Sequence, residues 1–217
     1  MERITDAFVW PVRDPEWAEK ILVIGLLLLI PILGVLNGLG WMLAGLDRLR
    51  AGEERLPPAN LTYLGRGFRL FVVNIVYAAA VGLIGTVIYS AAVILLARQG
   101  LTITQASGGL ALLLFGFGVV TLASVLAYFL MPTIVLAVEE GGIVAGLNLV
   151  TVVRRSRLSL NNTLIAGLML IAAAFVGSLG AIACLVGVYF TVAYSLAMQA
   201  WIYRSFELGA TTAPTGA

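Results

Sequence analysis

The sequence has no histidine, and its single cysteine, Cys184, lies inside an apolar run. Histidine is the commonest general base and transition-metal ligand, so its absence argues against most metal and haem sites. One cysteine cannot form an intramolecular disulfide, and Cys184 is predicted to be a small packing residue. Phosphate-cradling glycine loops and nucleophile motifs are missing too. We therefore expect no enzymatic activity, no cofactor and no bound metal.

Charge is also scarce. Only 11% of the 217 residues are charged, whereas 61% are hydrophobic, and the mean hydropathy is +1.04. Soluble domains average about 25% charged residues because water must solvate their surface. The net charge of +2 is too small to indicate a nucleic-acid partner.

Four long stretches contain no charged residue at all: 21–46, 70–97, 99–138 and 158–203. A charge at the centre of a bilayer costs at least about 2.5 kcal/mol, and a crossing helix needs about 20 apolar residues. The chain is therefore predicted to be all-α, a single polytopic transmembrane helical bundle over residues 1–217. The last stretch would be about 69 Å long as one helix, so it must turn back, and Gly177–Gly180 suit a turn.

The resulting prediction is about five crossings, joined by interfacial amphipathic helices and followed by a flexible tail at 207–217. The predicted membrane helices are 21–46, 70–97, 110–138, 158–177 and 181–203. Residues 143–157 are too few to cross and end in basic residues, which favours an interfacial basic helix.

The first apolar stretch contains Pro31 and nearby glycines, which allow a break. We favour one kinked crossing, and the alternative is two half-helices that form a re-entrant segment. The preceding residues 1–20 are predicted to lie in the membrane interface, with Trp10 and Trp17 at the level of the headgroups. A flexible tail is the alternative for these residues.

Basic residues predict the orientation, because short cytoplasmic loops are rich in lysine and arginine. They gather between the first and second crossings, between the third and fourth, and after the last. We expect a multi-pass protein of the plasma membrane whose basic loops and C-terminus are cytoplasmic. The side of the N-terminus depends on whether the first stretch crosses.

These basic residues are also candidate contacts for lipid headgroups, since each contributes about 1 kcal/mol of attraction to an anionic leaflet. A plain topology signal is the alternative. The candidate lipid contacts are Arg66, Arg69, Arg154, Arg155 and Arg157. Glu139 and Glu140 stand beside them at a predicted membrane boundary, and we interpret these two as a solvated helix terminus.

Small and polar residues recur at every fourth position on two predicted helices, and such residues share a helix face. We interpret both stripes as packing seams, and a polar pathway for a neutral or zwitterionic solute is the alternative. The candidate residues are Asn74, Gly82, Thr86 and Ser90 on one helix, and Gly187, Thr191, Ser195 and Gln199 on the other.

The stretch from Trp17 to Pro57 has a distinctive pattern: Trp17, an apolar helix, Gly40-Trp41, an arginine-bearing helix end and Leu56-Pro57. It resembles the opening of the prokaryotic membrane family called domain of unknown function 4013. Gly146 to Phe206 resembles that family more loosely. The resemblance implies a six-helix-like arrangement with cytoplasmic basic loops, and it implies no catalytic residues.

These observations together predict a non-enzymatic integral membrane protein, a structural or accessory subunit that packs with lipids or other membrane proteins. Its expected partners are anionic lipid headgroups at the cytoplasmic face, other membrane subunits or a second copy. The alternative function is a small permease or lipid-handling transporter that uses the polar stripes.

Overall fold

The computed structural model describes residues 4–98, 102–183 and 186–211, and every regular element in these ranges is helical. The all-α prediction is confirmed, whereas the prediction for Cys184 lies outside the described residues. The chain divides into unit 1, residues 1–73 and 128–217, and unit 2, residues 74–127. The elements are η1 Ile4–Phe8, η2 Trp10–Arg13, α1 Trp17–Leu28, α2 Leu33–Arg50, α3 Leu64–Leu96, α4 Ile103–Leu147, α5 Leu149–Leu158, α6 Leu160–Ser178, α7 Gly180–Ala183 and α8 Gly187–Thr211.

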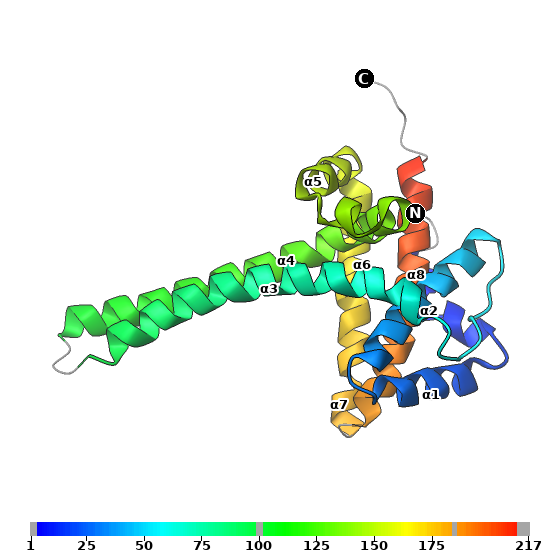
Figure 1. The fold of residues 1–217 in the computed structure, drawn as a ribbon, viewed down its shortest axis with the longest axis horizontal. Coiled ribbons are helices and arrows are strands. Elements are labelled where there is room, and N and C mark those ends of the chain that lie inside the picture. Colours follow the sequence, from blue (N-terminus) through cyan, green and yellow to red (C-terminus); the bar gives the residue numbers. More distant parts are fainter. Residues whose placement is uncertain (1–3, 99–101, 184–185, 212–217) are drawn as a thin grey trace. The chain divides into compact units, whose positions relative to one another are not determined.

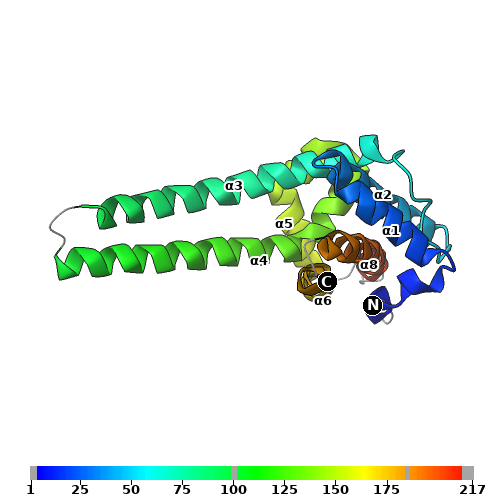
Figure 2. The same cartoon turned by 90° about the horizontal axis from the view of Figure 1, so that it is seen from below.

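Unit 2 is a hairpin in which the C-terminal part of α3 and the N-terminal part of α4 lie side by side (Figures 1 and 2). Glycines bring the two helices close together. A Cβ on Gly85 would lie 2.9 Å from a methyl of Val120, and one on Gly116 would lie 2.7 Å from a methyl of Ile88. The helix predicted at 110–138 is longer in the structure, because α4 begins at Ile103 and continues to Leu147.

The outer surface of this hairpin is apolar. Leu83, Val87, Leu114 and Phe117 are between 60% and 73% exposed. Soluble monomers rarely expose large contiguous patches of this kind. Within the described residues, three helical segments are long and apolar enough to cross a membrane: Leu64–Leu96, Ile103–Leu147 and Leu160–Ile182. No more than a third of the residues in their most apolar windows are buried by the chain itself, so the apolar side chains face outward.

The first apolar stretch, in unit 1, is two helices rather than the single kinked crossing that we favoured. α1 ends at Leu28, Pro31 lies in the break, and α2 begins at Leu33. The helices double back, because Lys20 near the start of α1 and Arg48 near the end of α2 both donate to the carbonyl oxygen of Leu56, at 3.3 and 3.2 Å. This is the geometry of the re-entrant alternative.

The N-terminal segment packs onto α8. Trp10 is completely buried, and its indole N–H donates to the carbonyl oxygen of Ala197 at 3.0 Å. Its ring stacks on Trp201 with a centroid distance of 5.9 Å. Trp10 is buried because a partner for its N–H and apolar surface are both available inside the protein. The placement of residues 1–20 at the level of the headgroups stays a prediction.

α6 and α8 form the second predicted hairpin. α6 ends at Ser178, as the glycine-containing turn suggested, but α8 begins at Gly187 rather than at 181, and α7 occupies Gly180–Ala183. α8 also continues to Thr211, so the predicted tail is helical over 207–211, and residues 212–217 are not described. α8 is not among the three candidate spans, since its tyrosines, Gln199 and Trp201 dilute its hydropathy.

Between the hairpins, α4 bends at Gly142, whose φ of 71° suits glycine. The interfacial helix predicted at 143–157 is therefore two pieces, the end of α4 and α5. α5 begins with an N-cap, in which the Asn148 side chain accepts from the amide of Thr151 at 3.1 Å. Ser156 on α5 hydrogen bonds to Thr133 on α4 at 2.9 Å and accepts at its carbonyl from Thr163 on α6 at 3.0 Å, which ties three helices together.

Candidate functional site

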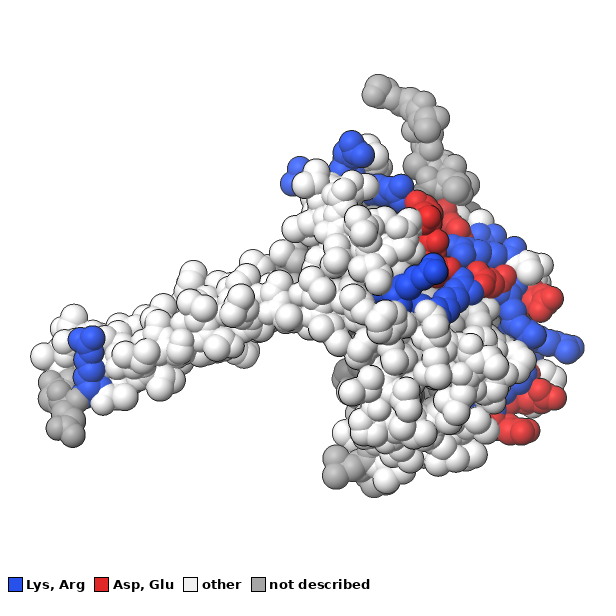
Figure 3. All heavy atoms as spheres, viewed as in Figure 1, with Lys and Arg blue, Asp and Glu red and all other residues white. Residues whose placement is uncertain are grey.

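Charged side chains from four helices of unit 1 meet in one cluster, and blue and red spheres gather on this unit in Figure 3. The charged cluster consists of Asp47, Arg50, Arg66, Glu139, Arg204 and Glu207. It joins the end of α2, the start of α3, the C-terminal part of α4 and the end of α8. These are the ends of the apolar stretches, so the cluster marks one polar end of unit 1.

Arg66 is the centre of the cluster. Its guanidinium bridges Asp47 and Glu139, with further contacts of 3.1 Å from Nη2 to Asp47 Oδ1 and 3.3 Å from Nε to Glu139 Oε1. The planar guanidinium can hold two carboxylates at once, which a lysine ammonium does less well. Arg66, which lies on α3, therefore links α2 to α4 through these two ion pairs.

Arg50 extends the cluster to α8. Its Nη2 lies 3.0 Å from Glu207 Oε1, and its Nη1 lies 3.8 Å from Glu139 Oε2. Glu207 also accepts from Arg204, one turn earlier on α8, at 2.8 Å. Three guanidinium groups thus alternate with three carboxylates, so the cluster is neutral overall and each acid touches at least one base.

The arginines of the cluster favour the ionised forms of Asp47 and Glu207. Partial burial by itself would raise the pKa of Asp47, but the hydrogen bond from Arg66 and the charges of Arg66 and Arg50 outweigh burial and hold that pKa below its ordinary value. Burial likewise opposes ionisation of Glu207, and Arg50 and Arg204 lower its pKa in the same way. The ion pairs of Asp47 and Glu207 are therefore intact at neutral pH.

The sequence interpretation missed this cluster. Glu139 was taken for part of a solvated helix terminus, yet its side chain is only 16% exposed and binds Arg66. A signal was present: acidic and basic residues stand at the ends of apolar stretches that the hairpin prediction brings to one side. Arginine and carboxylate side chains at such ends come within hydrogen-bonding reach of each other when their helices pack together.

A second polar centre fixes the N-terminal segment. Asp14 is 2% exposed and accepts from Lys20 at 2.8 Å, from the amide of Leu56 at 2.8 Å and from the amide of Glu16 at 2.9 Å. Burial opposes its ionisation, but the Lys20 ammonium and the two amides lower its pKa below the ordinary value. The loop between α2 and α3 is thereby held against the start of α1.

The predicted lipid contacts separate into two groups. Arg66 is engaged by the charged cluster, and Arg155 pairs with Glu140 at 2.6 Å while remaining exposed. Arg69, Arg154 and Arg157 are exposed and make no ion pair within the described part of the chain. Because Arg66 binds Glu139 and Arg155 binds the adjacent Glu140, the two basic segments lie near the same stretch of α4.

The predicted stripe on α8 lies in the seam with α6. Thr191 donates to the carbonyl oxygen of Gly177 at 2.6 Å, and a Cβ on Gly177 would touch Ser195 at 3.3 Å. Gln199 donates to Ser195 at 3.4 Å. Gly187, Thr191 and Gln199 are half-buried and Ser195 is buried. These side chains hydrogen bond within the protein, as a packing seam requires.

The predicted stripe on α3, unlike the one on α8, is mostly exposed. Gly82, Thr86 and Ser90 are exposed, and Asn74 is half-buried. Thr86 and Ser90 donate back to their own helix, to the carbonyls of Gly82 and Val87 at 2.8 and 3.1 Å. The seam of unit 2 instead uses the face of Gly85, so the α3 stripe is not the surface that packs against α4.

The acidic side chains of the charged cluster are paired with bases rather than grouped with one another. Over residues 4–98, 102–183 and 186–211, no three histidine, cysteine, aspartate or glutamate residues are grouped so that they could hold a metal ion. Every carboxylate of the charged cluster contacts an arginine. The ion pairs of the charged cluster hold residues of α2, α3, α4 and α8 together.

The fold and this site define a class: an all-helical membrane protein with long apolar helices and a cluster of ion pairs within unit 1. The family model described as "Protein of unknown function (DUF4013)" matches residues 23–186, which is most of the chain. The chain belongs to this family of unknown function, in agreement with the resemblance seen in its opening segment. No curated protein and no solved structure is significantly similar to it.

Proposed function

We propose that this membrane protein is a non-enzymatic structural or accessory subunit, which packs through unit 2 against other membrane proteins and lipids. The plasma membrane is the proposed location, with the basic loops and the C-terminus in the cytoplasm. The observation that carries the proposal is the outward face of unit 2, which carries large exposed apolar side chains and on which Gly82, Thr86 and Ser90 are exposed.

Helix association in lipid depends on close van der Waals packing, because lipid tails are as apolar as the side chains. Gly82 lies on the exposed face of α3, and a Cβ placed there would meet nothing within 4 Å. Thr86, one turn further on, has its hydroxyl bonded to its own helix. This face therefore presents a shallow, hydrogen-bonded surface to which a neighbouring membrane helix could approach closely.

The permease alternative is less well supported. A solute pathway needs polar groups that face water, whereas Thr191 and Ser195 on α8 are engaged in the seam with α6. The exposed hydroxyls of α3 lie among large apolar side chains such as Leu83 and Val87. Hydroxyls surrounded by large apolar side chains are typical of a surface that packs in lipid.

Purification from native membranes in a mild detergent tests the proposal. We expect the full-length protein to retain a membrane protein in fixed stoichiometry, either another subunit or a second copy. Gly82→Leu should reduce that retention about tenfold, since overpacking a close contact costs on the order of 1–3 kcal/mol. Co-purified proteins are identified and quantified by mass spectrometry.

Gly118→Leu is the matched control, because Gly118 is an exposed glycine of α4 that also has no neighbour within 4 Å in the chain. It should retain the partner at the wild-type level. A protein that elutes as a monomer without any membrane partner, or one whose partner is unaffected by Gly82→Leu, would contradict the proposal.

A further inference from the structure

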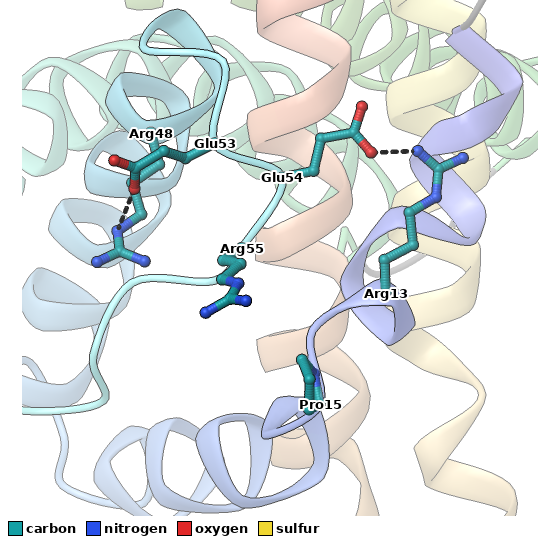
Figure 4. Close-up of a pocket in the computed structure, with 6 residues that line it drawn as sticks. All are labelled: Arg13, Pro15, Arg48, Glu53, Glu54 and Arg55. Carbon is teal, nitrogen blue, oxygen red and sulfur yellow. Dashed lines mark hydrogen bonds and ion pairs between the residues drawn. The ribbon is translucent and has the colours of Figure 1, made fainter.

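A polar hollow of about 670 Å³ opens beside the N-terminal segment, within unit 1 (Figure 4). One wall comes from η2 and the residues after it, and the other from α2 and the loop that follows. Its lining residues are Arg13, Pro15, Arg48, Glu53, Glu54 and Arg55. Three arginines and two glutamates leave the lining with one positive charge more than negative.

Arg13 is already fully engaged. Its two terminal nitrogens bind Glu54 at 2.6 Å and Asp6 at 2.9 Å, and its guanidinium carbon lies 5.6 Å from the ring centroid of Trp201. These contacts neutralise Glu54 and fix one wall of the hollow. Hydrogen bonds to both carboxylates raise the pKa of Arg13, so its side chain stays charged.

The opposite wall retains binding capacity. Arg48 donates through Nη1 to the carbonyl oxygen of Leu56 at 3.2 Å, but its contact with Glu53 is loose, with 3.8 Å between Nε and the nearest carboxylate oxygen. Arg55 is exposed and has no ion pair within the described ranges of the chain. Figure 4 shows its guanidinium in the open middle of the hollow, between Arg48 and Arg13.

We propose that this hollow binds a phosphate group through Arg55, with Arg48 as the second donor. Guanidinium groups match the geometry of phosphate oxygens and bind them with paired, charge-assisted hydrogen bonds. The phosphate belongs either to the headgroup of an anionic lipid or to a soluble phosphate ester. Because the contact between Arg48 and Glu53 is long, a phosphate oxygen can replace Glu53 as the partner of the Arg48 guanidinium.

This site is independent of the proposed subunit role, because it lies in unit 1 and needs no contact of the α3 stripe. Its residues also differ from the arginines that the sequence suggested as lipid contacts. Retention of a membrane partner and phosphate binding can therefore succeed or fail separately.

The test uses the full-length protein in detergent, with two probes. The first arm measures binding of inorganic phosphate by thermal stabilisation, against chloride at equal ionic strength. The second arm measures retention of phosphatidylglycerol against phosphatidylcholine by native mass spectrometry. Arg55→Ala should weaken binding of the effective probe about tenfold, as expected for loss of a hydrogen bond to a charged group.

Arg98→Ala is the control, since it removes the same charge from an exposed arginine that follows α3 in unit 2. Its binding should equal that of the wild type. Binding of inorganic phosphate shows that a soluble phosphate group is sufficient without a lipid, and selective retention of phosphatidylglycerol without binding of inorganic phosphate identifies a lipid headgroup. The proposal is overturned if neither probe binds, if Arg55→Ala binds like the wild type, or if Arg98→Ala loses as much.

Discussion

Gly67→Ala is expected to lower the melting temperature of the detergent-solubilised protein by about 6–12 °C, corresponding to about 3 kcal/mol. Gly67 lies at the start of α3, where this helix touches α2. A Cβ at this position would overlap the carbonyl oxygen of Leu36 and lie 2.7 Å from the amide nitrogen of Gly40. Both obstacles are backbone atoms, so no side-chain rotation can relieve them.

Gly65→Ala is the matched control. Gly65 is in the same helical turn, and a Cβ there would have no neighbour within 4 Å. Alanine at this exposed position should leave the melting temperature unchanged or raise it slightly, because alanine favours helix over glycine. Equal effects of the two substitutions, measured by circular dichroism, would show that α2 and α3 do not approach as closely as the structure has them.

Arg66→Ala is expected to reduce the free energy of unfolding by about 2–3 kcal/mol. The change removes hydrogen bonds to two carboxylates and leaves Glu139, whose side chain is 16% exposed, without its closest partner. Solvent screens a pair at a fully exposed surface, but this pair is only partly exposed, so the effect exceeds that of an ordinary surface ion pair. Unfolding in detergent, followed by circular dichroism against denaturant, measures the change.

The control is Arg69→Ala, one turn further along α3. Arg69 is exposed and forms no ion pair with any described residue, so its replacement should change stability by less than about 0.5 kcal/mol. Arg66→Lys should recover only part of the loss, because an ammonium is a poorer bridge between two carboxylates. A loss of equal size in Arg69→Ala would refute the role of the charged cluster.

The helical class and the second hairpin could be predicted from the sequence because both follow from the cost of charge in hydrocarbon. A run as long as 158–203 cannot lie straight in a bilayer, and Gly177–Gly180 supply the turn. α6 does end at Ser178. The exact start of α8 was not predictable, since no charge or proline marks it in the sequence.

The course of the first apolar stretch depended on packing that hydropathy does not encode. Pro31 allows either a kink or a break, and the glycines of α2 decide between them by letting the helices approach. A Cβ on Gly34 would lie 2.6 Å from the Cα of Leu28 on α1. Trp10 illustrates the same limit: an indole is equally suited to a headgroup layer and to a buried site with an acceptor.

The two small-residue stripes looked equivalent in the sequence but differ in the structure. On α8 the stripe coincides with the seam, as Ser195 against Gly177 shows. On α3 two faces carry small residues, one through Gly82 and one through Gly85, and only the second packs within the hairpin. Periodicity identifies faces of a helix, but the neighbouring helix selects which face is buried.

The central claim is that the basic segments beside the charged cluster lie on one side of the membrane. The direct test places one cysteine at a time, in a chain whose own Cys184 is replaced by alanine, at Arg69, Arg157 or Arg98. Sealed vesicles of known orientation are then labelled with a membrane-impermeant maleimide. Cysteines at 69 and 157 should label from one side and the cysteine at 98 from the other, because α3 has 33 residues and so is about 50 Å long. Labelling at 69 and 157 from opposite sides would contradict the account.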